Sequence, residues 1–398
     1  MKKFFVFFTV VLLQLFLLSR ISFASNKPIL WNYKHLREIK SDIISETERQ
    51  GIIKYADQCL SQPYVVVTEK TKSFCDDYHY YSSIGIYWWP DENSQTGMPY
   101  INKDGVLNPE YAEYDYLRLI TLSKRLKYLS LAFFFTRDMR YYDYYVGQVE
   151  AWFVNKETLM YPNFEYAQVI PGRNNNKGRG AGLTEAVEFN TIIESFRLIN
   201  SCRRIKRPLK KEIIQWFRDF SDWMANSETG KSCSNANDNT AICYDVILLN
   251  MSIFSENKER SQMLIRDFKS RRIDSQIDTD GRYTAELKRT KAYYYSIKSL
   301  SHIVDFSLLA ESLGYHVYRD NKKIIDKSVD YLYQFVSNRE EFGYNQISDW
   351  EGCEQFLILQ IDRLSTFSTL FERLFESPDI KNNGLRSIQR LQYLLQYE

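Results

Sequence analysis

Histidine, proline and glycine are infrequent in this chain of 398 residues, which contains 4 His, 9 Pro and 15 Gly. Four scattered histidines are too few for a typical zinc site, and no cysteine pair shows a metal-ligand spacing such as C-x-x-C. We therefore expect no metal and no other cofactor. The sequence also lacks a low-complexity or Pro/Gly-rich linker of the kind that separates domains, which favours one continuous domain.

The sequence has a single long apolar run, which lies at the N-terminus. Two lysines precede residues 4–18, which are almost all apolar, and the small residues Ser22 and Ala24 follow. This order is typical of a signal peptide. We predict a signal peptide over residues 1–24 and a mature chain of 25–398 that is periplasmic or secreted; an uncleaved N-terminal anchor is the alternative. No second apolar stretch is long enough to cross a bilayer, so no membrane span is expected in the mature chain.

Neither sign of charge is in excess, because 52 Lys and Arg face 50 Asp and Glu, for a formal net charge of +2. Removal of the predicted signal peptide, with its three basic residues, leaves about −1. A nearly neutral protein has no overall field that attracts a polyanion, and nucleic-acid-binding proteins usually show a basic excess. We expect no nucleic-acid partner, and any acidic ligand must be bound by a local cationic cleft.

Six cysteines lie in the predicted mature chain, where export makes disulfides possible. They permit 15 full pairings, among which the sequence does not choose. Cys233 and Cys243 flank a segment of interest at 238–240. A disulfide there would stiffen that segment, but both thiols are equally compatible with a reduced, buried state.

Aromatic residues are abundant, with 30 Tyr, 25 Phe and 7 Trp. Tyrosines pack helical cores with the hydroxyl at the rim, and they also line sugar-binding clefts; composition leaves both roles open. Apolar residues recur with helical spacing in segments that include 117–133, 213–223, 300–313, 324–336 and 356–371. Strand-like alternation is brief, near 64–67.

These patterns predict an all-α chain of ten or more helices. Turn-rich segments at 89–108, 171–182 and 227–239 interrupt the helices, and long loops in compact domains are usually functional. An α/α toroid and a solenoid of helix pairs both suit this pattern. The absence of a fixed repeat period argues against the solenoid.

Three of the loop segments carry specific motifs. The first reads HYYSSIGIYWWPD at 79–91, followed by GMPYI at 97–101, DG at 104–105 and NPE at 108–110; the second reads FEYAQVIPG at 164–172, followed by GRG; the third reads ELKRT at 286–290. Together these motifs resemble the alginate lyase family, and most closely polysaccharide lyase family 38. The resemblance extends from about residue 78 to 347, and the SIGxYWWPD run is its most specific part.

The resemblance implies a fold, a ligand and a reaction. The fold is an (α/α) toroid, an incomplete α/α barrel of paired antiparallel helices with long cleft-lining loops, over the single domain 25–398. The ligand is an acidic polysaccharide, a polyuronate of the alginate or glucuronan type. The reaction is β-elimination, in which a base removes the C5 proton of a uronate and the bond to the 4-oxygen breaks.

Site residues follow from the same resemblance. Asn239 matches the carboxylate-binding asparagine of the family, Arg289 the charge-neutralising arginine and Tyr295 the catalytic tyrosine. A guanidinium suits a carboxylate because it stays charged and binds two oxygens. A free tyrosine has a pKa of ~10, and we expect Arg289 to lower that of Tyr295 by ~1–3 units. Six positions separate these two residues, so a non-helical start near Thr290 is needed for them to meet.

Thr240 departs from the family, which has a histidine at this position. Threonine does not titrate near neutral pH, and loss of an acid–base group typically costs ~10²–10⁴ in rate. In one interpretation Tyr295 makes both proton transfers and Thr240 only donates a hydrogen bond. In the other, the protein is a catalytically weak or inactive polyuronate-binding relative. His79 is a further candidate to substitute for the missing histidine.

Eight residues are predicted to bind substrate: His79, Tyr80, Tyr87, Trp88, Trp89, Gln168, Arg179 and Tyr244. Each also has a structural interpretation. The aromatic residues would pin a loop to the toroid, and Arg179 with its basic neighbours would be a solvated loop. Arg289 would be a surface cation, Tyr295 a core residue like Tyr293 and Tyr294, and Asn239 and Thr240 helix N-caps.

A glycoside hydrolase on the same toroid is the remaining alternative. Hydrolases of this kind need two carboxylates that face the scissile bond. Asp76 or Asp77 with Asp245 would be the pair, although no spacing in the sequence supports it specifically.

Overall fold

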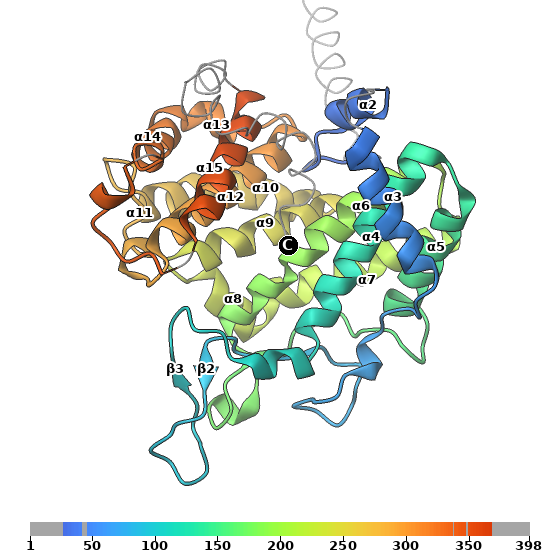
Figure 1. Cartoon of the computed structure of the whole chain (residues 1–398), viewed down its shortest axis with the longest axis horizontal. Coiled ribbons are helices and arrows are strands. Elements are labelled where there is room, and N and C mark those ends of the chain that lie inside the picture. Colours follow the sequence, from blue (N-terminus) through green and yellow to red (C-terminus); the bar gives the residue numbers. More distant parts are fainter. Residues whose placement is uncertain (1–26, 42–45, 337, 348, 368–398) are drawn as a thin grey trace, which may run out of the picture.

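A computed structural model describes residues 27–41, 46–336, 338–347 and 349–367. The predicted signal peptide lies outside the described residues. Most of the described chain is helical (Figure 1). The α-helices are α2 (Tyr33–Ser41), α3 (Glu46–Leu60), α4 (Tyr116–Thr136), α5 (Met139–Phe153), α6 (Glu188–Cys202), α7 (Arg207–Asn226), α8 (Glu228–Ser234), α9 (Asn239–Phe254), α10 (Lys258–Phe268), α11 (Asp274–Gln276), α12 (Ala292–Glu311), α13 (Val317–Asp320), α14 (Lys322–Tyr333) and α15 (Trp350–Ser365).

An inner layer of helices forms the centre of the molecule. Helix α4 packs on α6, α6 on α9, α9 on α12 and α12 on α15. Every residue of α9 except Thr240 is buried, and a helix that is apolar on all sides belongs inside a fold. The intervening helices form an outer layer, with α5 on α4, α7 and α10 on α9, and α14 on α12. In α7 the buried side chains recur with helical spacing on one face, as expected of a helix between core and solvent.

This alternation of inner and outer helices is the (α/α) toroid. Because each inner helix is followed by an antiparallel outer one, the inner helices run in the same direction and their N-terminal ends lie at one end of the toroid. Helix N-termini carry partial positive charge. The loops that precede α4, α6, α9 and α12 therefore meet at an end that is suited to anions.

Much of the aromatic content belongs to the core. Trp216 and Phe220 of α7 stack with ring centroids 5.3 Å apart, and Phe189 of α6 lies within 5.3 Å of both rings. Such contacts add to the burial of apolar area.

Two small sheets organise the loops at this end. Strand β1 (Ser82–Ile84) pairs in parallel with β4 (Tyr166–Val169), and β2 (Trp88–Trp89) pairs antiparallel with β3 (Ile101–Asn102). The first sheet thus joins two loop motifs that lie about eighty positions apart. In Figure 1 the β2–β3 segment extends from one end of the molecule, below α8.

Several details differ from the sequence-based expectations. Residues 64–67 form no strand but lead into the 3-10 helix Val67–Glu69. The segment 227–239 contains the helix α8. Within α4, Leu117 is exposed and Ile120 is only partly buried, whereas Leu126, Leu129 and Phe133 are buried as the helical spacing predicts. The predicted helix 356–371 lies partly outside the described residues.

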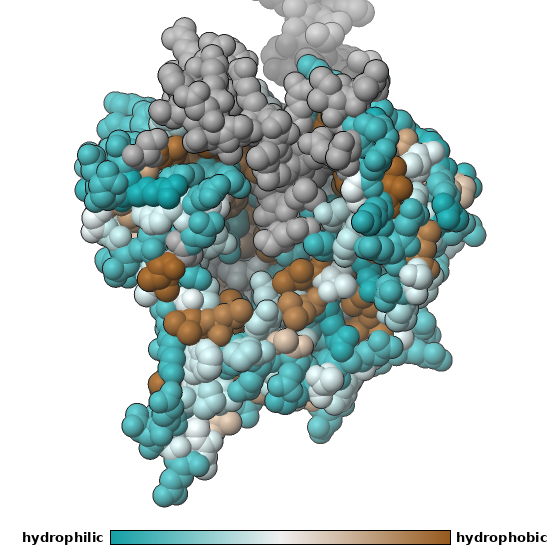
Figure 2. Space-filling model, viewed as in Figure 1, coloured by the Kyte–Doolittle hydropathy of each residue, from teal (hydrophilic) through white to brown (hydrophobic). Residues whose placement is uncertain are grey.

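The surface drawn in Figure 2 is mostly hydrophilic with separate apolar patches. Within the described ranges, no helix has the length and apolar character needed to cross a membrane.

Candidate active site

The segment before α12 holds Arg289 against Asp104. Arg289 is extended, with φ −87° and ψ 158°. Its Nη2 donates to Oδ1 of Asp104 at 2.8 Å and its Nε to Oδ2 at 3.3 Å. The backbone N–H and the hydroxyl of Thr290 donate to Oδ2 at 3.2 and 3.0 Å. Burial acts to raise the pKa of Asp104, but these donors lower it to about 2, so the carboxylate is ionised and fixes the guanidinium.

Gly105 permits this contact between two distant loops. Its φ is +79°, and a Cβ at this position would lie 2.7 Å from the hydroxyl oxygen of Thr290. Both the left-handed conformation and the close approach require glycine.

Tyr295, on the first turn of α12, lies against Arg289. The guanidinium carbon of Arg289 is 4.0 Å from the centroid of the Tyr295 ring. The chain between them is not helical before Ala292, since Lys291 has φ −119° and ψ 53°. The predicted non-helical start is therefore present, and it brings together two residues that helical spacing alone would keep apart.

The hydroxyl of Tyr295 donates a hydrogen bond to the hydroxyl of Tyr87 at 3.2 Å. Burial and Tyr87 together raise the pKa of Tyr295 above its ordinary value, while Arg289 acts to lower it. We expected a net lowering by Arg289. The direction of its effect is as predicted, but it is outweighed by desolvation, which disfavours the phenolate.

Asn239 is held at the N-terminus of α9 by Glu286. Its backbone N–H donates to Oε1 of Glu286 at 2.6 Å, and its Nδ2 donates to Oε2 at 3.0 Å. Burial raises the pKa of Glu286 to about 7, although the Asn239 hydrogen bonds act to lower it. The carboxylate fixes the amide and leaves its second N–H and its Oδ1 for another partner.

The N-cap of α9 is Asp238, not Asn239 or Thr240. Its Oδ1 accepts from the backbone N–H of Thr240 at 2.9 Å and also from the Thr240 hydroxyl. The cap satisfies an N–H group at the start of the helix. Thr240 is partly exposed at the site, but its hydroxyl hydrogen is directed to the cap.

Trp88, Gln168 and Arg179 form a second cationic part of the site. Nη2 of Arg179 donates to Oε1 of Gln168 at 2.7 Å, and its guanidinium carbon lies 5.8 Å from the Trp88 ring centroid. Arg173 lies 5.2 Å from the same ring. Burial lowers the pKa of Arg179, and Arg289 adds to this effect while Asp238 opposes it. These electrostatic contacts connect the second loop motif with the Arg289 region.

The backbone of Gln168 is strained, with φ +50°. A hydrogen bond holds this backbone in place: the N–H of Gln168 donates to the hydroxyl of Ser83 at 2.7 Å across the β1–β4 pair. A non-glycine residue in this region persists only when its surroundings hold it. In this conformation Oε1 of Gln168 accepts the hydrogen bond from Arg179.

His79 and Tyr80 lie in a different set of contacts from Tyr295. Nδ1 of His79 is 2.7 Å from the carbonyl oxygen of Leu159, and its ring stacks on Tyr161 at 5.1 Å. Tyr80 packs edge-on against Tyr161 and Tyr166. The suggestion that His79 substitutes for the family histidine receives no support from these contacts.

Two further predictions have structural outcomes. Nε1 of Trp89 donates to the carbonyl oxygen of Val106 at 3.0 Å, so Trp89 pins the first loop. Tyr244 is 4% exposed and its hydroxyl donates to the carbonyl oxygen of Met224 at 3.0 Å. Its hydroxyl is thus engaged in the core, and these contacts give its prediction as a substrate-binding residue no support.

The structure does not support the glycoside hydrolase alternative, because one of its two carboxylates, Asp245, is not available. Asp245 is buried and its two oxygens accept from Nε and Nη2 of Arg272 at 2.7 and 3.0 Å. A carboxylate that is sealed in this way does not face a substrate. All six cysteines are free thiols, and the Sγ of Cys233 lies 3.6 Å from the Thr240 carbonyl oxygen.

The sequence analysis did not predict that Asp104 and Glu286 position other site residues, although both lie in the quoted motifs. Each holds a predicted site residue through two oxygens. The available signal was an acidic residue in each of two motif loops. The sequence did not reveal which cation or amide each one binds.

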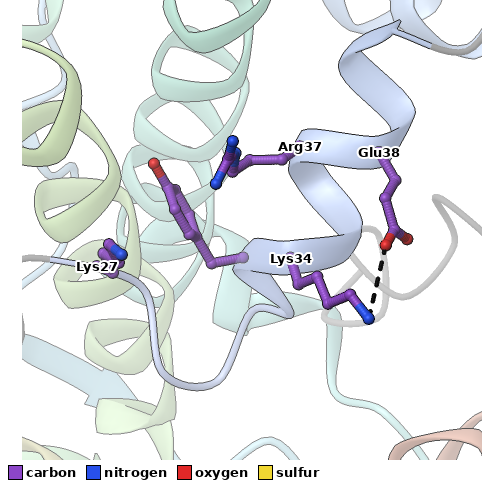
Figure 3. Close-up of a pocket in the computed structure, with 5 residues that line it drawn as sticks. Lys27, Lys34, Arg37 and Glu38 are labelled. Carbon is purple, nitrogen blue, oxygen red and sulfur yellow. Dashed lines mark ion pairs between the residues drawn. The ribbon is translucent and has the colours of Figure 1, made fainter.

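A basic pocket of about 440 Å³ lies elsewhere, on α2 (Figure 3). It is lined by Lys27, Tyr33, Lys34, Arg37 and Glu38, and Lys34 lies 3.9 Å from Glu38. In Figure 1, α2 and the β2–β3 segment lie at opposite ends of the molecule, so this pocket is separate from the site. Across the part of the chain with described coordinates, no three His, Cys, Asp or Glu side chains are grouped to hold a metal ion.

Comparison with known proteins identifies the family. The family model described as alginate lyase matches residues 67–342. The chain belongs to the alginate lyase family. It is therefore a polysaccharide lyase by family, and no curated protein matches it.

Solved alginate lyases have the same fold. An alginate lyase from Bacteroides ovatus is 29% identical, with a TM-score of 0.84 over 92% of this chain and 99% of that chain. Alginate lyase A1-III, from Sphingomonas species A1, has been solved with a tetrasaccharide as a histidine-to-alanine variant. That structure is 11% identical, with a TM-score of 0.54 over 81% of this chain and 88% of the other. At this identity the likeness concerns the fold alone.

Proposed function

We propose that this protein is an exported lyase, closest to polysaccharide lyase family 38, that cleaves a polyuronate of the alginate or glucuronan type by β-elimination. The arrangement of Arg289 and Tyr295 carries the proposal. A permanent cation lies 4.0 Å from the ring of a tyrosine whose hydroxyl is directed by Tyr87. Asn239, at the N-terminus of a buried helix, completes a set of donors for a carboxylate.

In the proposed reaction Tyr295 acts as base and then as acid. The Tyr295 phenolate accepts the C5 proton of a uronate, and the electrons of the C–H bond form the C4–C5 double bond. The bond from C4 to the glycosidic oxygen breaks, and Tyr295 returns its proton to that oxygen. One chain gains an unsaturated end, the other gains a hydroxyl, and no water is consumed.

Charge neutralisation makes the C5 proton more acidic. Asn239 and Nη1 of Arg289, which makes no hydrogen bond within the described part of the chain, would bind the carboxylate of the reacting uronate, while Nε and Nη2 stay on Asp104. Preorganised donors of this kind are each worth ~10²–10³ in rate. Arg179, held by Gln168 and without a hydrogen bond at its buried Nε within the described ranges, supplies a second cation for the polymer.

The raised pKa of Tyr295 predicts that the enzyme works best under alkaline conditions. The same observation, together with Thr240 in place of a histidine, supports a second candidate. In that case the protein binds polyuronate and turns it over very slowly. The tetrasaccharide complex of the A1-III variant supports an oligosaccharide as ligand in either case.

The test exposes residues 25–398 to polymannuronate, polyguluronate, alginate and glucuronan from neutral to alkaline pH. Ultraviolet absorbance of unsaturated uronate is measured together with new reducing ends. Elimination gives both signals in equal amount, and hydrolysis gives reducing ends alone. Neither signal from any polymer, with binding detected by calorimetry, would leave the binding protein as the function. Fractionation of the native host tests export.

A further inference from the structure

Lys298 is a cation of the inner layer that the roles above do not use. It lies on α12, one turn after Tyr294 and Tyr295, and is only partly buried although its neighbours 295–297 and 299–301 are buried.

The direction of the side chain follows from helix geometry. Side chains on an α-helix lean toward the N-terminus of that helix. The N-terminus of α12 is the end where Arg289 and Tyr295 lie. The side chain of Lys298, six positions after the first residue of α12, therefore extends back toward Arg289 and Tyr295.

The groups whose charges affect the pKa of Lys298 come from the same part of the fold. Burial acts to lower the pKa of Lys298, but Tyr294, Cys243, Tyr87 and Glu286 act together to raise it. These residues come from α12, α9, the first loop and the segment before Arg289. Glu188, at the start of α6, is also in range. The inner helices and two motif loops thus converge on this ammonium.

The ammonium has no close counter-ion. Across the described ranges no carboxylate oxygen lies within the 4.0 Å ion-pair distance of Lys298, whereas Arg289 is bound by Asp104 and Arg272 by Asp245. The next polar residue on this face of α12, His302, is buried, and burial lowers its pKa to about 3, so it carries no charge. A charge in such a position is costly to desolvate unless an anion meets it.

We propose that the Lys298 ammonium binds the carboxylate of the uronate that reacts at Tyr295. This inference rests on the proposed function. It adds a permanent cation to a site where Thr240 cannot carry charge and where Asp104 already occupies two of the Arg289 nitrogens.

The test measures binding without turnover, in the Tyr295→Phe background. Calorimetry compares a tetrauronate with its methyl ester, which has no carboxylate charge. Lys298→Met should weaken binding of the acid by about 10- to 100-fold and leave binding of the ester unchanged. Lys298→Arg should retain part of the preference for the acid. Lys288→Met removes an equally large cation from an exposed position of the neighbouring segment and should change neither affinity.

Equal effects of Lys298→Met on acid and ester would overturn the proposal, because a purely structural role does not distinguish the two ligands. If Lys298→Met fails to fold, Lys298→Gln decides: a selective loss of affinity for the acid supports a binding role, and an unchanged ratio of acid to ester affinity contradicts it. The outcome is independent of turnover. A wild-type protein that binds the acid but yields no unsaturated product removes the proposed lyase function, and the affinities of the Lys298 variants still test the binding role.

Discussion

The hydroxyl of Tyr295 donates a hydrogen bond to the hydroxyl of Tyr87 at 3.2 Å. The bond stabilises the neutral phenol, and it is one of the causes that raise the pKa of Tyr295. It joins the specific run of the first loop to the helix that carries the proposed base. The loop therefore both closes the site and sets the protonation of its central residue.

Tyr87→Phe removes this hydrogen bond and should lower the pKa of Tyr295. The alkaline rise in activity should move toward neutral pH by roughly one unit. A pH–rate profile of kcat measures the shift. Tyr64→Phe is the control, because Tyr64 is exposed and packs against Tyr144, and its profile should match the wild type. If the pH profile of Tyr87→Phe is unshifted, the hydrogen bond does not control the pKa on which the rate depends.

Asp104→Asn should release the guanidinium of Arg289 from its position on Tyr295. We expect kcat to fall by about tenfold or more, as for a lost preorganised donor, while the fold is retained. Glu92→Gln is the control: it removes the 3.0 Å ion pair with Lys103 in the same loop, where Glu92 is 81% exposed. Such surface pairs contribute little. Equal kcat values for the two variants would contradict the role given to Asp104.

The same carboxylate predicts an acid-range effect on stability. The pKa of Asp104 is lowered to about 2 in the folded protein, below an unfolded value of ~3.9. Its contribution is therefore present above pH ~4 and is lost as the pH falls through about 2. The difference in unfolding free energy between wild type and Asp104→Asn should be constant from pH 5 to 8 and shrink below pH 4.

Glu286→Gln should lower activity by misplacing Asn239, since one of the two accepting oxygens is lost. The pKa of Glu286 is about 7, so wild-type activity should fall as the pH drops below 7 and the carboxylate protonates, whereas the variant should lack this limb. In an Asn239→Ala background, Glu286→Gln should have little further effect on kcat. Fully additive losses would show that Glu286 acts by another route.

Stability responds to Glu286 in the opposite direction from activity. Its folded pKa is raised above an unfolded value of ~4.3, so its favourable contribution is present below that value and is lost as the pH rises through about 7. Chemical denaturation at pH 5 and pH 8 should therefore show the wild type losing stability relative to Glu286→Gln as the pH increases.

Thr240→Val should have a small effect on activity, because the hydroxyl of Thr240 serves the cap of α9. Stability should fall by about 1 kcal/mol for one hydrogen bond, and Asp238→Ala should cost about 0.5–2 kcal/mol through loss of the whole cap. Rates and urea unfolding of both variants check this. A loss of activity by ~10² in Thr240→Val, as for an acid–base group, would contradict it.

The sequence predicted the helices best where the apolar spacing is long and regular. In α7 the residues Ile213, Phe217 and Phe220 lie on the buried face as expected. In α4 the predicted segment begins at Leu117, which is exposed, while its later apolar positions Leu126 and Leu129 are buried. An inner helix is apolar on several faces, so spacing identifies only part of its buried surface. The strand pairs were missed because each has only two to four residues and depends on a distant partner.

The site was predictable only as far as the motifs reached. The resemblance pointed to Asn239, Arg289 and Tyr295. In the structure Asn239 donates to Glu286 and Arg289 donates to Asp104. The same resemblance included Tyr244, which is in the core, because a motif does not say which way a helical side chain points. Asp104 and Glu286 act through contacts across the fold, and one sequence does not reveal such pairs.

The central claim, that Tyr295 removes the C5 proton, is tested most directly by replacing the three adjacent tyrosines singly. Tyr293→Phe, Tyr294→Phe and Tyr295→Phe would be assayed for unsaturated uronate on the best polymer at alkaline pH. Only Tyr295→Phe should abolish the product, by at least ~10², while Tyr293→Phe should mainly lose stability with its 3.0 Å bond to the Leu332 carbonyl. Wild-type rates of elimination in Tyr295→Phe would contradict the account.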